Sequence, residues 1–200
     1  RNVNFEKAIP LPCLYRPFDF RFMLYGKFAF DYPRPEINDQ LLRPNLALIT
    51  TRQTKEQFSI FVTNKLVGQH KLATPYDGSY LSILYHYPTE VGTKGQDTIF
   101  LEKRPYLKPP FLKILSEKLN LKQKGEYGLP EGIAPEDIFY YAYAVFHSPT
   151  YRERYAEFLK IDFPRLPLTS DLGLFRDLAA LGQQLVALHL LDAKAAPILH

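Results

Sequence analysis

Hydrophobic and polar residues alternate in short stretches through the first half of the chain, which is the pattern of strands with one buried face. The alternation is strongest at residues 15–25, where it places Asp19 and Arg21 on one face within reach of an ion pair. Further strands are predicted at residues 46–51, 58–62, 79–87 and 99–102, which are rich in β-branched and aromatic residues. The polar, partly basic residues 52–56 form the loop between two of these strands.

Hydrophobic residues recur at helical spacing after residue 109. A helix over residues 110–119 turns one face inward, formed by Phe111, Leu112, Leu115 and Leu119. Residues 135–146 are apolar on nearly every face, which predicts a buried helix. Ser148 followed by Pro149 predicts the N-terminus of another helix, with an inner stripe of Tyr151, Tyr155, Phe158 and Leu159.

The last predicted helix begins after a cap at Thr169 or Ser170 and ends near residue 191. Its leucines repeat at spacings of four and three, as in the seam of a coiled coil: Leu174, Leu178, Leu181, Leu185 and Leu188. Gly182 lies beside this seam and permits a close approach of another helix. His147 and His189 fall near helix ends, where a positive charge complements the helix dipole.

These patterns predict an α+β fold in which a mostly antiparallel sheet lobe is followed by a helical C-terminal lobe. Residues 123–134 hold four Gly or Pro residues and no strong period, so we expect the boundary there. The predicted lobes are residues 1–125 and residues 126–200. The hydrophobic content of 46% provides for a sizeable core and excludes a disordered chain.

Charge is divided unevenly between the two predicted lobes. Residues 1–125 hold 19 Lys+Arg and 11 Asp+Glu, a balance of +8, whereas residues 126–200 hold 6 and 10, a balance of −4. This division indicates that a polyanion contacts the first lobe and not the second. An ordinary solvated lysine surface accounts for the same numbers, and charge alone leaves both interpretations open.

The sequence lacks the motifs of several catalytic classes. It has no Gly-rich cofactor loop, no phosphate-binding GxxxxGK[ST] loop and no pair of histidines at zinc-helix spacing. We therefore expect no methyltransferase, nuclease or ATPase activity and no cofactor or metal in this chain itself. No apolar run is long enough for a membrane helix, no signal peptide is visible, and the single Cys13 fits a reducing cytoplasm. The chain starts at Arg1 and its only Met is Met23, so we expect a piece of a longer protein.

Binding chemistry remains, because Arg and Lys neutralise phosphates and Arg also reads guanine in the major groove. The candidate DNA-binding residues are Arg16, Arg21, Arg43, Arg52, Lys55, Lys65, Lys71 and Arg104, with Arg34, Lys94 and Lys103 as further basic candidates. Many of them fall in loops between predicted strands, where a sheet presents them to a ligand. For each lysine taken singly, a solvated surface position is the alternative.

Several motifs resemble the C-terminal specificity region of type ISP restriction-modification enzymes. The resemblance rests on Arg16-Pro17-Phe18-Asp19-Phe20-Arg21 followed by Tyr25, and on the segment from Pro135 to Leu168. It continues with Phe175, Leu181-Gly182 and Leu188-His189-Leu190, and more loosely with Asn45, Leu46 and Arg52. The chain departs from the family at Leu81 to Tyr85, where the family often shows Phe-Pro-Leu-Tyr.

The resemblance implies a target recognition domain that binds double-stranded DNA in cis with an adenine-N6 methyltransferase. It further implies nuclease and helicase-like domains upstream in the same polypeptide, and S-adenosylmethionine, ATP and Mg²⁺ as cofactors of that larger enzyme. A structural coupling module that docks the enzyme's domains together, with only non-specific DNA contact, is the alternative. An RNA or single-strand binder is a third possibility, although no Lys/Arg-Gly-aromatic strand signature is present.

Overall fold

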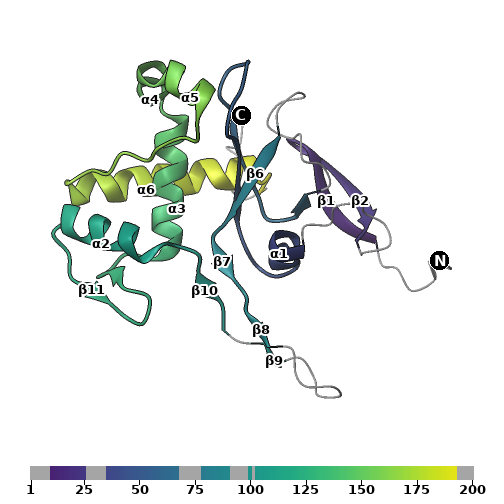
Figure 1. Cartoon of the computed structure of the whole chain (residues 1–200), viewed down its shortest axis with the longest axis horizontal. Helices are drawn as coiled ribbons and strands as arrows, with labels where there is room; N and C mark the ends of the chain where they lie inside the picture. Colours follow the sequence, from purple (N-terminus) through teal and green to yellow (C-terminus); the bar gives the residue numbers. More distant parts are fainter. Residues whose placement is uncertain (1–9, 26–34, 68–77, 91–98, 101, 193–200) are drawn as a thin grey trace, which may run out of the picture.

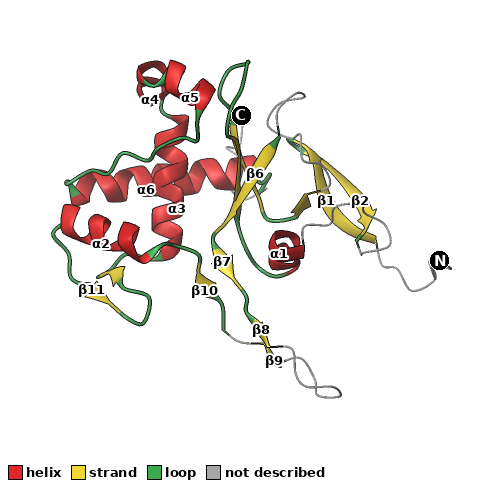
Figure 2. Ribbon diagram, viewed as in Figure 1, coloured by secondary structure: helices red, strands yellow, loops and turns green. Residues whose placement is uncertain are grey.

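The computed structural model describes residues 10–25, 35–67, 78–90, 99–100 and 102–192. Small, mostly antiparallel sheets come first along the chain and helices follow them, so the predicted α+β class is confirmed (Figures 1 and 2). We refer to residues 10–105 as the strand region and to residues 109–189 as the helical region.

The first strands form a hairpin, in which β1 (Pro10–Arg16) pairs antiparallel with β2 (Asp19–Leu24). The single strand predicted at residues 15–25 is therefore wrong in its extent. Pro17 and Phe18 make the turn, and Phe18 has a positive φ of 63°, which is unusual for a residue other than glycine. The short β5 (Leu66–Val67) adds to the other edge of β1 in parallel, and α1 (Pro35–Asn38) with the 3-10 turn η2 (Asp39–Leu42) leads to the next sheet.

The second sheet has the order β4 (Ile60–Thr63), β3 (Ala47–Thr51) and β6 (Ser79–Ile83), which confirms the strands predicted near these positions. The predicted strand at residues 79–87 divides at Leu84, after which β7 (Tyr85–His86) pairs with β10 (Arg104–Pro105) instead. Beyond them, β8 (Thr89–Glu90) pairs with β9 (Ile99–Phe100). Together β7–β8 and β9–β10 form a narrow ribbon that projects from the body of the molecule (Figure 1).

The helical region follows the predicted order, with one short β-hairpin inserted, but the single helix predicted after Ser148 divides at Tyr155 into two. Tyr151 and Leu159 of its predicted inner stripe are buried, whereas Tyr155 is 39% exposed. The elements are α2 (Pro109–Lys118), β11 (Gln123–Lys124), β12 (Leu129–Pro130), α3 (Pro135–His147), α4 (Pro149–Arg154), α5 (Ala156–Ile161) and α6 (Leu172–His189). Ser148 caps α4 as predicted, since its side chain accepts a hydrogen bond from the Tyr151 amide. The cap of α6 is Asp171 and not Thr169 or Ser170, because the Asp171 carboxylate accepts from the Leu174 amide at 3.0 Å.

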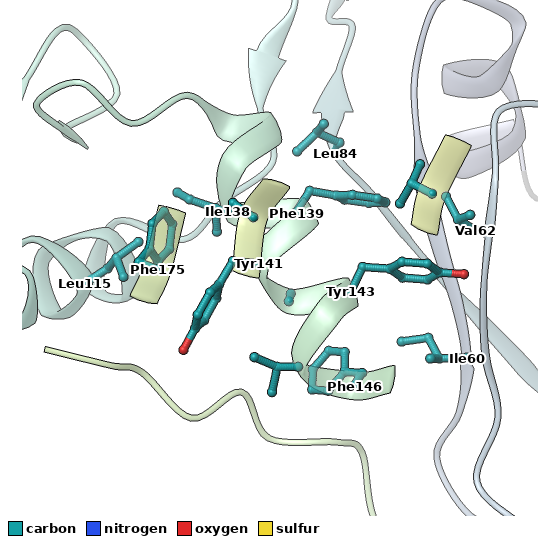
Figure 3. Close-up of a cluster of buried hydrophobic side chains, with 14 of the residues drawn as sticks. Ile60, Val62, Leu84, Leu115, Ile138, Phe139, Tyr141, Tyr143, Phe146 and Phe175 are labelled. Carbon is teal, nitrogen blue, oxygen red and sulfur yellow. The ribbon is translucent and has the colours of Figure 1, made fainter. Parts of the chain in front are cut away.

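The main core forms where α3 packs against α6 and against β4 (Figure 3). Tyr143 and Phe175 are fully buried there, and Ile60 and Val62 of the strand region belong to the same cluster. Leu115 of α2 packs into it as well, so this core crosses the predicted lobe boundary. The division at residue 125 stays a prediction.

The predicted leucine seam of α6 is only partly correct: Leu178 and Leu185 are half-buried and pack against the core, but the seam is not the most buried face of the helix. The buried face consists of Phe175, Ala179, Gly182 and Val186, whereas Leu174, Leu181 and Leu188 are 47%, 58% and 40% exposed. The cause is the close approach of α3, which the predicted role of Gly182 anticipated. A Cβ at Gly182 would lie 1.9 Å from the Tyr140 carbonyl oxygen, so the face that holds Gly182 is the one that fits closely against α3.

Candidate nucleic-acid interface

The predicted DNA-binding residues fall into three pairs and one single position within the described part of the chain. The pairs are Arg16 with Arg21, Arg52 with Lys55, and Arg43 with Lys65; Arg104 lies on the ribbon. Lys71 lies outside the described residues, as do Arg34 and Lys94.

Arg16 and Arg21 share one aromatic ring on the β1–β2 hairpin. The Arg21 guanidinium lies 3.8 Å from the Tyr15 ring centroid, and that of Arg16 lies 5.4 Å from it. Arg21 also donates to Asp19 at 3.1 Å, which confirms the predicted ion pair on one strand face. Arg21 is thus fixed by two partners while remaining exposed, so it presents a positioned charge to solvent.

Arg52 and Lys55 lie on the loop between β3 and β4, and this loop contacts the helical region. The Arg52 Nε lies 3.6 Å from the Asp162 carboxylate, and the Thr54 amide donates to the Lys160 carbonyl at 3.0 Å. Both arginine and lysine side chains are exposed. The loop therefore links the two regions as well as carrying charge.

Arg43 and Lys65 line one hollow of about 480 Å³ between β1, the segment before β3 and the β4–β5 turn. The Arg43 guanidinium lies 5.1 Å from the Tyr87 ring centroid. Asn64 and Asn45 line the same hollow, so two cations and two amides border it, although the Asn45 side chain is bound to the Tyr85 backbone. Such a group suits an anionic or polar ligand.

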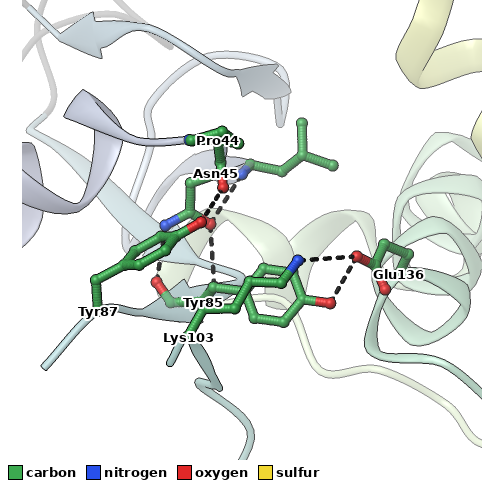
Figure 4. A network of polar contacts seen from close by, with 7 residues as sticks. Pro44, Asn45, Tyr85, Tyr87, Lys103 and Glu136 are labelled. Carbon is green, nitrogen blue, oxygen red and sulfur yellow. Dashed lines mark hydrogen bonds and ion pairs between the residues drawn. The ribbon is translucent and has the colours of Figure 1, made fainter. Parts of the chain in front are cut away.

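The base of the ribbon is fixed by a polar network (Figure 4). The Asn45 side chain bridges both backbone groups of Tyr85, accepting from its amide at 3.0 Å and donating to its carbonyl at 2.7 Å. The Tyr87 hydroxyl donates to the Pro44 carbonyl at 2.5 Å, and the Tyr87 amide donates to Gln40 at 2.6 Å. The side chain of Asn45 thereby takes the place of a neighbouring strand and holds β7 in one position.

The inner side of the ribbon contacts the start of α3. The Tyr85 hydroxyl donates to Glu136 at 2.6 Å, and the Lys103 ammonium lies 3.9 Å from that carboxylate and 3.8 Å from the Tyr85 ring centroid. Burial and the Glu136 carboxylate raise the pKa of Tyr85, so its proton stays in this hydrogen bond. Lys103, one of the further basic candidates, therefore serves as a partner of Glu136.

The outer side of the ribbon carries a different set of residues. His86 is stacked on Tyr106 with ring centroids 6.1 Å apart, Arg104 is exposed, and the Lys108 ammonium lies 5.7 Å from the Tyr106 ring. Sequence reasoning identified only Arg104 in this set. The alternation Arg104-x-Tyr106-x-Lys108 just before α2 could have indicated Tyr106 and Lys108, whereas His86 joins them only through its pairing with Arg104.

A second polar cluster lies where α3, α4 and α6 meet. The Tyr143 hydroxyl lies 2.5 Å from His189 Nδ1, and the Arg152 guanidinium lies 3.2 Å from His147 Nδ1. Burial, reinforced by the Arg152 charge, lowers the pKa of His147 to about 4 and also lowers that of His189. The prediction that these histidines complement the helix dipole is therefore wrong, because burial keeps them neutral at pH 7.

Among the described residues, no group of three or more potential metal ligands occurs, and no helix combines the length and apolarity needed to cross a bilayer.

Comparison with known proteins places residues 1–199 within the family model described as the Type ISP C-terminal specificity domain. Sequence comparison with curated proteins found no match. Among solved structures, a cryo-EM structure of a DrdV–DNA complex is similar at 27% identity and a TM-score of 0.72, over 95% of this chain and 16% of that chain.

Two further structures share the fold. The ATP-dependent Type ISP restriction-modification enzyme LlaBIII, bound to DNA, matches at 22% identity and a TM-score of 0.73, over 100% of this chain and 12% of that one. A nuclease-deletion mutant of the Type ISP enzyme LlaGI, in complex with a DNA substrate mimic, matches at 20% identity and a TM-score of 0.60, over 92% and 11%. The chain thus spans between 11% and 16% of the length of these three proteins.

Proposed function

Because this chain belongs to the family of Type ISP C-terminal specificity domains, we propose that it recognises a particular sequence of duplex DNA for a larger restriction-modification enzyme. The observation that carries this proposal is the family match over nearly the whole chain. The DNA in the three similar structures supports the same ligand class.

The distribution of charge supports duplex DNA as the ligand. The cations on the hairpin, in the hollow and on the ribbon all lie within residues 1–125, the part of the sequence with a balance of +8. Phosphate contacts of this kind supply most of the affinity for DNA and fix the register of the protein on the duplex. Base reading then depends on side chains that this register places in a groove.

We propose that the rest of the enzyme supplies the catalysis. An adenine-N6 methyltransferase, a helicase-like motor and a nuclease in the same polypeptide would use S-adenosylmethionine, ATP and Mg²⁺, in the cytoplasm where the host DNA lies. The ATP-dependent LlaBIII, of which this chain matches 12%, supports the ATP requirement. In this arrangement the 200-residue chain contributes binding and no chemistry.

Selection from a pool of duplexes with a randomised central segment tests the proposal. The purified chain is mixed with the pool at physiological salt, and bound duplexes are sequenced over several rounds. We expect enrichment of one short motif, and weaker binding to single-stranded DNA and to RNA of matched length. Binding without enrichment of any motif would contradict sequence recognition, and a preference for single strands would contradict the duplex assignment.

A structural coupling module is the second candidate, and the exposed leucines of α6 favour it. Leu174, Leu181 and Leu188 recur every seven residues and leave an apolar stripe in solvent. Such stripes mark contact surfaces between helices. The selection experiment separates the two functions, because a coupling module binds duplexes without sequence preference.

A further inference from the structure

The ribbon formed by β7 and β10 has an outer face whose chemistry differs from that of its inner face. We propose that this outer face, formed by His86, Arg104, Tyr106 and Lys108, is a phosphate-binding surface that positions duplex DNA along the ribbon. The proposal rests on the proposed function and assigns to that function a surface that sequence reasoning identified only through Arg104.

The strand register decides which side chains share this face. Arg104 and His86 are direct partners in the antiparallel pair, and partners of this kind point to the same side of a sheet. Tyr106 follows Arg104 by two residues, and its ring stacks on His86, so it lies on that side as well. Lys108 follows by two more residues with an extended backbone, and its ammonium lies near the Tyr106 ring.

The two faces differ in how their charges are balanced. On the inner face the Glu136 carboxylate accepts from the Tyr85 hydroxyl and lies 3.9 Å from the Lys103 ammonium, so one carboxylate offsets one cation. On the outer face two exposed cations, Arg104 and Lys108, stand against one carboxylate, the exposed Glu102, which precedes Arg104 by two residues and so falls on the same face. The outer face is therefore net positive and exposed.

The spacing of these groups fits a linear polyanion. Arg104, Tyr106 and Lys108 follow one another at two-residue intervals, which corresponds to about 6.6 Å in extended chain. Arginine, lysine and tyrosine side chains are all common donors to DNA phosphates. A row of such donors matches a strand of regularly repeated phosphates better than it matches a single carboxylate.

The row is also held in place before any ligand arrives. The Tyr106 amide donates to the Leu84 carbonyl at 2.8 Å, and the Leu84 amide donates to the Leu46 carbonyl at 2.8 Å. Asn45 fixes β7 from the other side, and the Lys108 carbonyl accepts the amides of Phe111 and Leu112 at the start of α2. A surface fixed in this way binds without the entropic cost of ordering its backbone.

The decisive variant replaces both cations, Arg104→Ala with Lys108→Ala, in the full 200-residue chain. The probe is a fluorescent duplex carrying the motif enriched in the selection above, titrated at several salt concentrations. We expect the double variant to bind several-fold more weakly, with a plot of log affinity against log salt that is less steep by roughly 1.8, because each lost phosphate contact removes about 0.9. Lys113→Ala with Lys118→Ala on α2 is the matched control and should keep the wild-type slope.

Two further measurements keep the outcome unambiguous. Phosphate contacts carry no base information, so the double variant should enrich the same motif as the wild type; a changed motif would overturn the phosphate assignment. Tyr106→Phe should lower affinity by less than the double variant, since the ring is kept and only the hydroxyl donor is lost.

The result that overturns the inference is an unchanged salt slope for Arg104→Ala with Lys108→Ala, while the wild-type chain still enriches a motif. The proposed function then survives and the ribbon surface does not. If the wild-type chain enriches no motif, the proposed function fails by itself. If the wild-type chain binds no duplex at all, the ribbon assignment falls with it. Equal melting temperatures of the variants establish that their folds are intact, as expected for side chains that are already in solvent.

Discussion

The helical region and the strand region differ in how many large side chains they bury. Helix α3 alone contributes a fully buried Tyr143 together with the buried Phe139 and Phe146, and α6 contributes a fully buried Phe175. The strand region instead consists of sheets of two or three strands, and its exposed side chains include most of the candidate cations. A two-stranded sheet is marginally stable alone, and a three-stranded one needs a packed hydrophobic face.

The strand region is therefore held in shape partly by its attachments to the helices. Ile60 and Val62 pack into the helical core, Tyr85 donates to Glu136, and Thr54 donates to Lys160. The strand region also has small buried clusters of its own, around Leu66 and around Ile49, so these attachments add to its cohesion and offset the repulsion between its like charges. Stability and binding should consequently respond to different substitutions.

The largest expected effect is on the helical core. Phe146→Ala removes a ring that is 6% exposed and packs against Tyr151 with centroids 5.6 Å apart. Truncation of a buried Phe typically costs about 3–5 kcal/mol, a large share of the roughly 5–15 kcal/mol that holds a domain folded. The melting temperature should fall sharply, whereas Phe22→Ala, at a ring that is 78% exposed, should leave it nearly unchanged.

The outcome that would break the comparison is a Phe146→Ala chain with wild-type melting and lost DNA affinity. Helix α3 would then belong to the DNA-binding surface, and the assignment of binding to the strand region would be withdrawn. Thermal denaturation followed by circular dichroism measures the melting temperature, and titration with a duplex measures the DNA affinity.

The next largest effect concerns the contact between α3 and α6. Gly182→Ala places a methyl group 1.9 Å from the Tyr140 carbonyl oxygen, so the two helices must separate. Overpacking of this kind costs typically 1–3 kcal/mol. Gly173→Ala in the same helix is the control for a contact away from α3: its methyl group meets only the Asp171 carboxylate that caps α6, at 3.1 Å, so any loss there is limited to the cap, about 1 kcal/mol. A Gly182→Ala chain as stable as the wild type would contradict the observed packing of α6.

The helices show which parts of the fold the sequence predicts and why. Residues 135–146 are apolar on nearly every side, so α3 could be placed and recognised as buried without knowledge of its neighbours. In α6 two stripes of residues repeat at spacings of four and three. The more hydrophobic one, the leucines, was predicted to be the buried face, but the buried one consists of Phe175, Ala179, Gly182 and Val186. The choice between them depends on how closely α3 approaches, which is a property of the packed structure and not of the pattern.

In the candidate interface, too, the sequence identifies the residue types but not the direction in which their side chains point. The sequence identified Arg104 and Lys103 as basic candidates, but the two neighbours point to opposite faces of the ribbon. The face that each side chain points to follows from the pairing of β10 with β7. This pairing could not be predicted, because nothing in residues 79–87 indicates that the strand divides at Leu84. Likewise, the turn at Phe18 was hidden inside an unbroken alternation.

A moderate effect is expected from pH, through the histidine cluster of the helical region. His147 has its pKa lowered to about 4 in the folded protein, against about 6.5 when unfolded. The unfolded chain therefore binds more protons below pH 6.5, and stability falls as the pH is lowered from 6.5 towards 4. We expect a loss of about 1–2 kcal/mol at pH 5, after allowance for the partial exposure of the ring.

Urea denaturation at pH 7.5 and at pH 5 measures this loss, and His147→Gln provides the control because it removes the titrating group. The variant should lose less stability than the wild type between the two pH values. Equal losses would show that the acid sensitivity arises elsewhere, for example from the carboxylates of the surface ion pairs.

The smallest expected effect on stability lies at the contact between the two regions. Arg52 and Asp162 form an ion pair at 3.6 Å with side chains that are 59% and 42% exposed, and exposed pairs contribute at most about 1 kcal/mol. Arg52→Ala should therefore leave the melting temperature nearly unchanged. If Arg52 contacts phosphate, the same variant should reduce the salt slope of duplex binding by about 0.9, as Lys55→Ala should too.

Asp162→Ala separates the two roles of Arg52. It breaks the ion pair but leaves the cation, so binding should be retained or strengthened once a competing carboxylate is gone. If Asp162→Ala weakens binding as much as Arg52→Ala does, Arg52 acts by holding the β3–β4 loop against the helices, and the boundary between a stable region and a binding region is less sharp than their composition indicates.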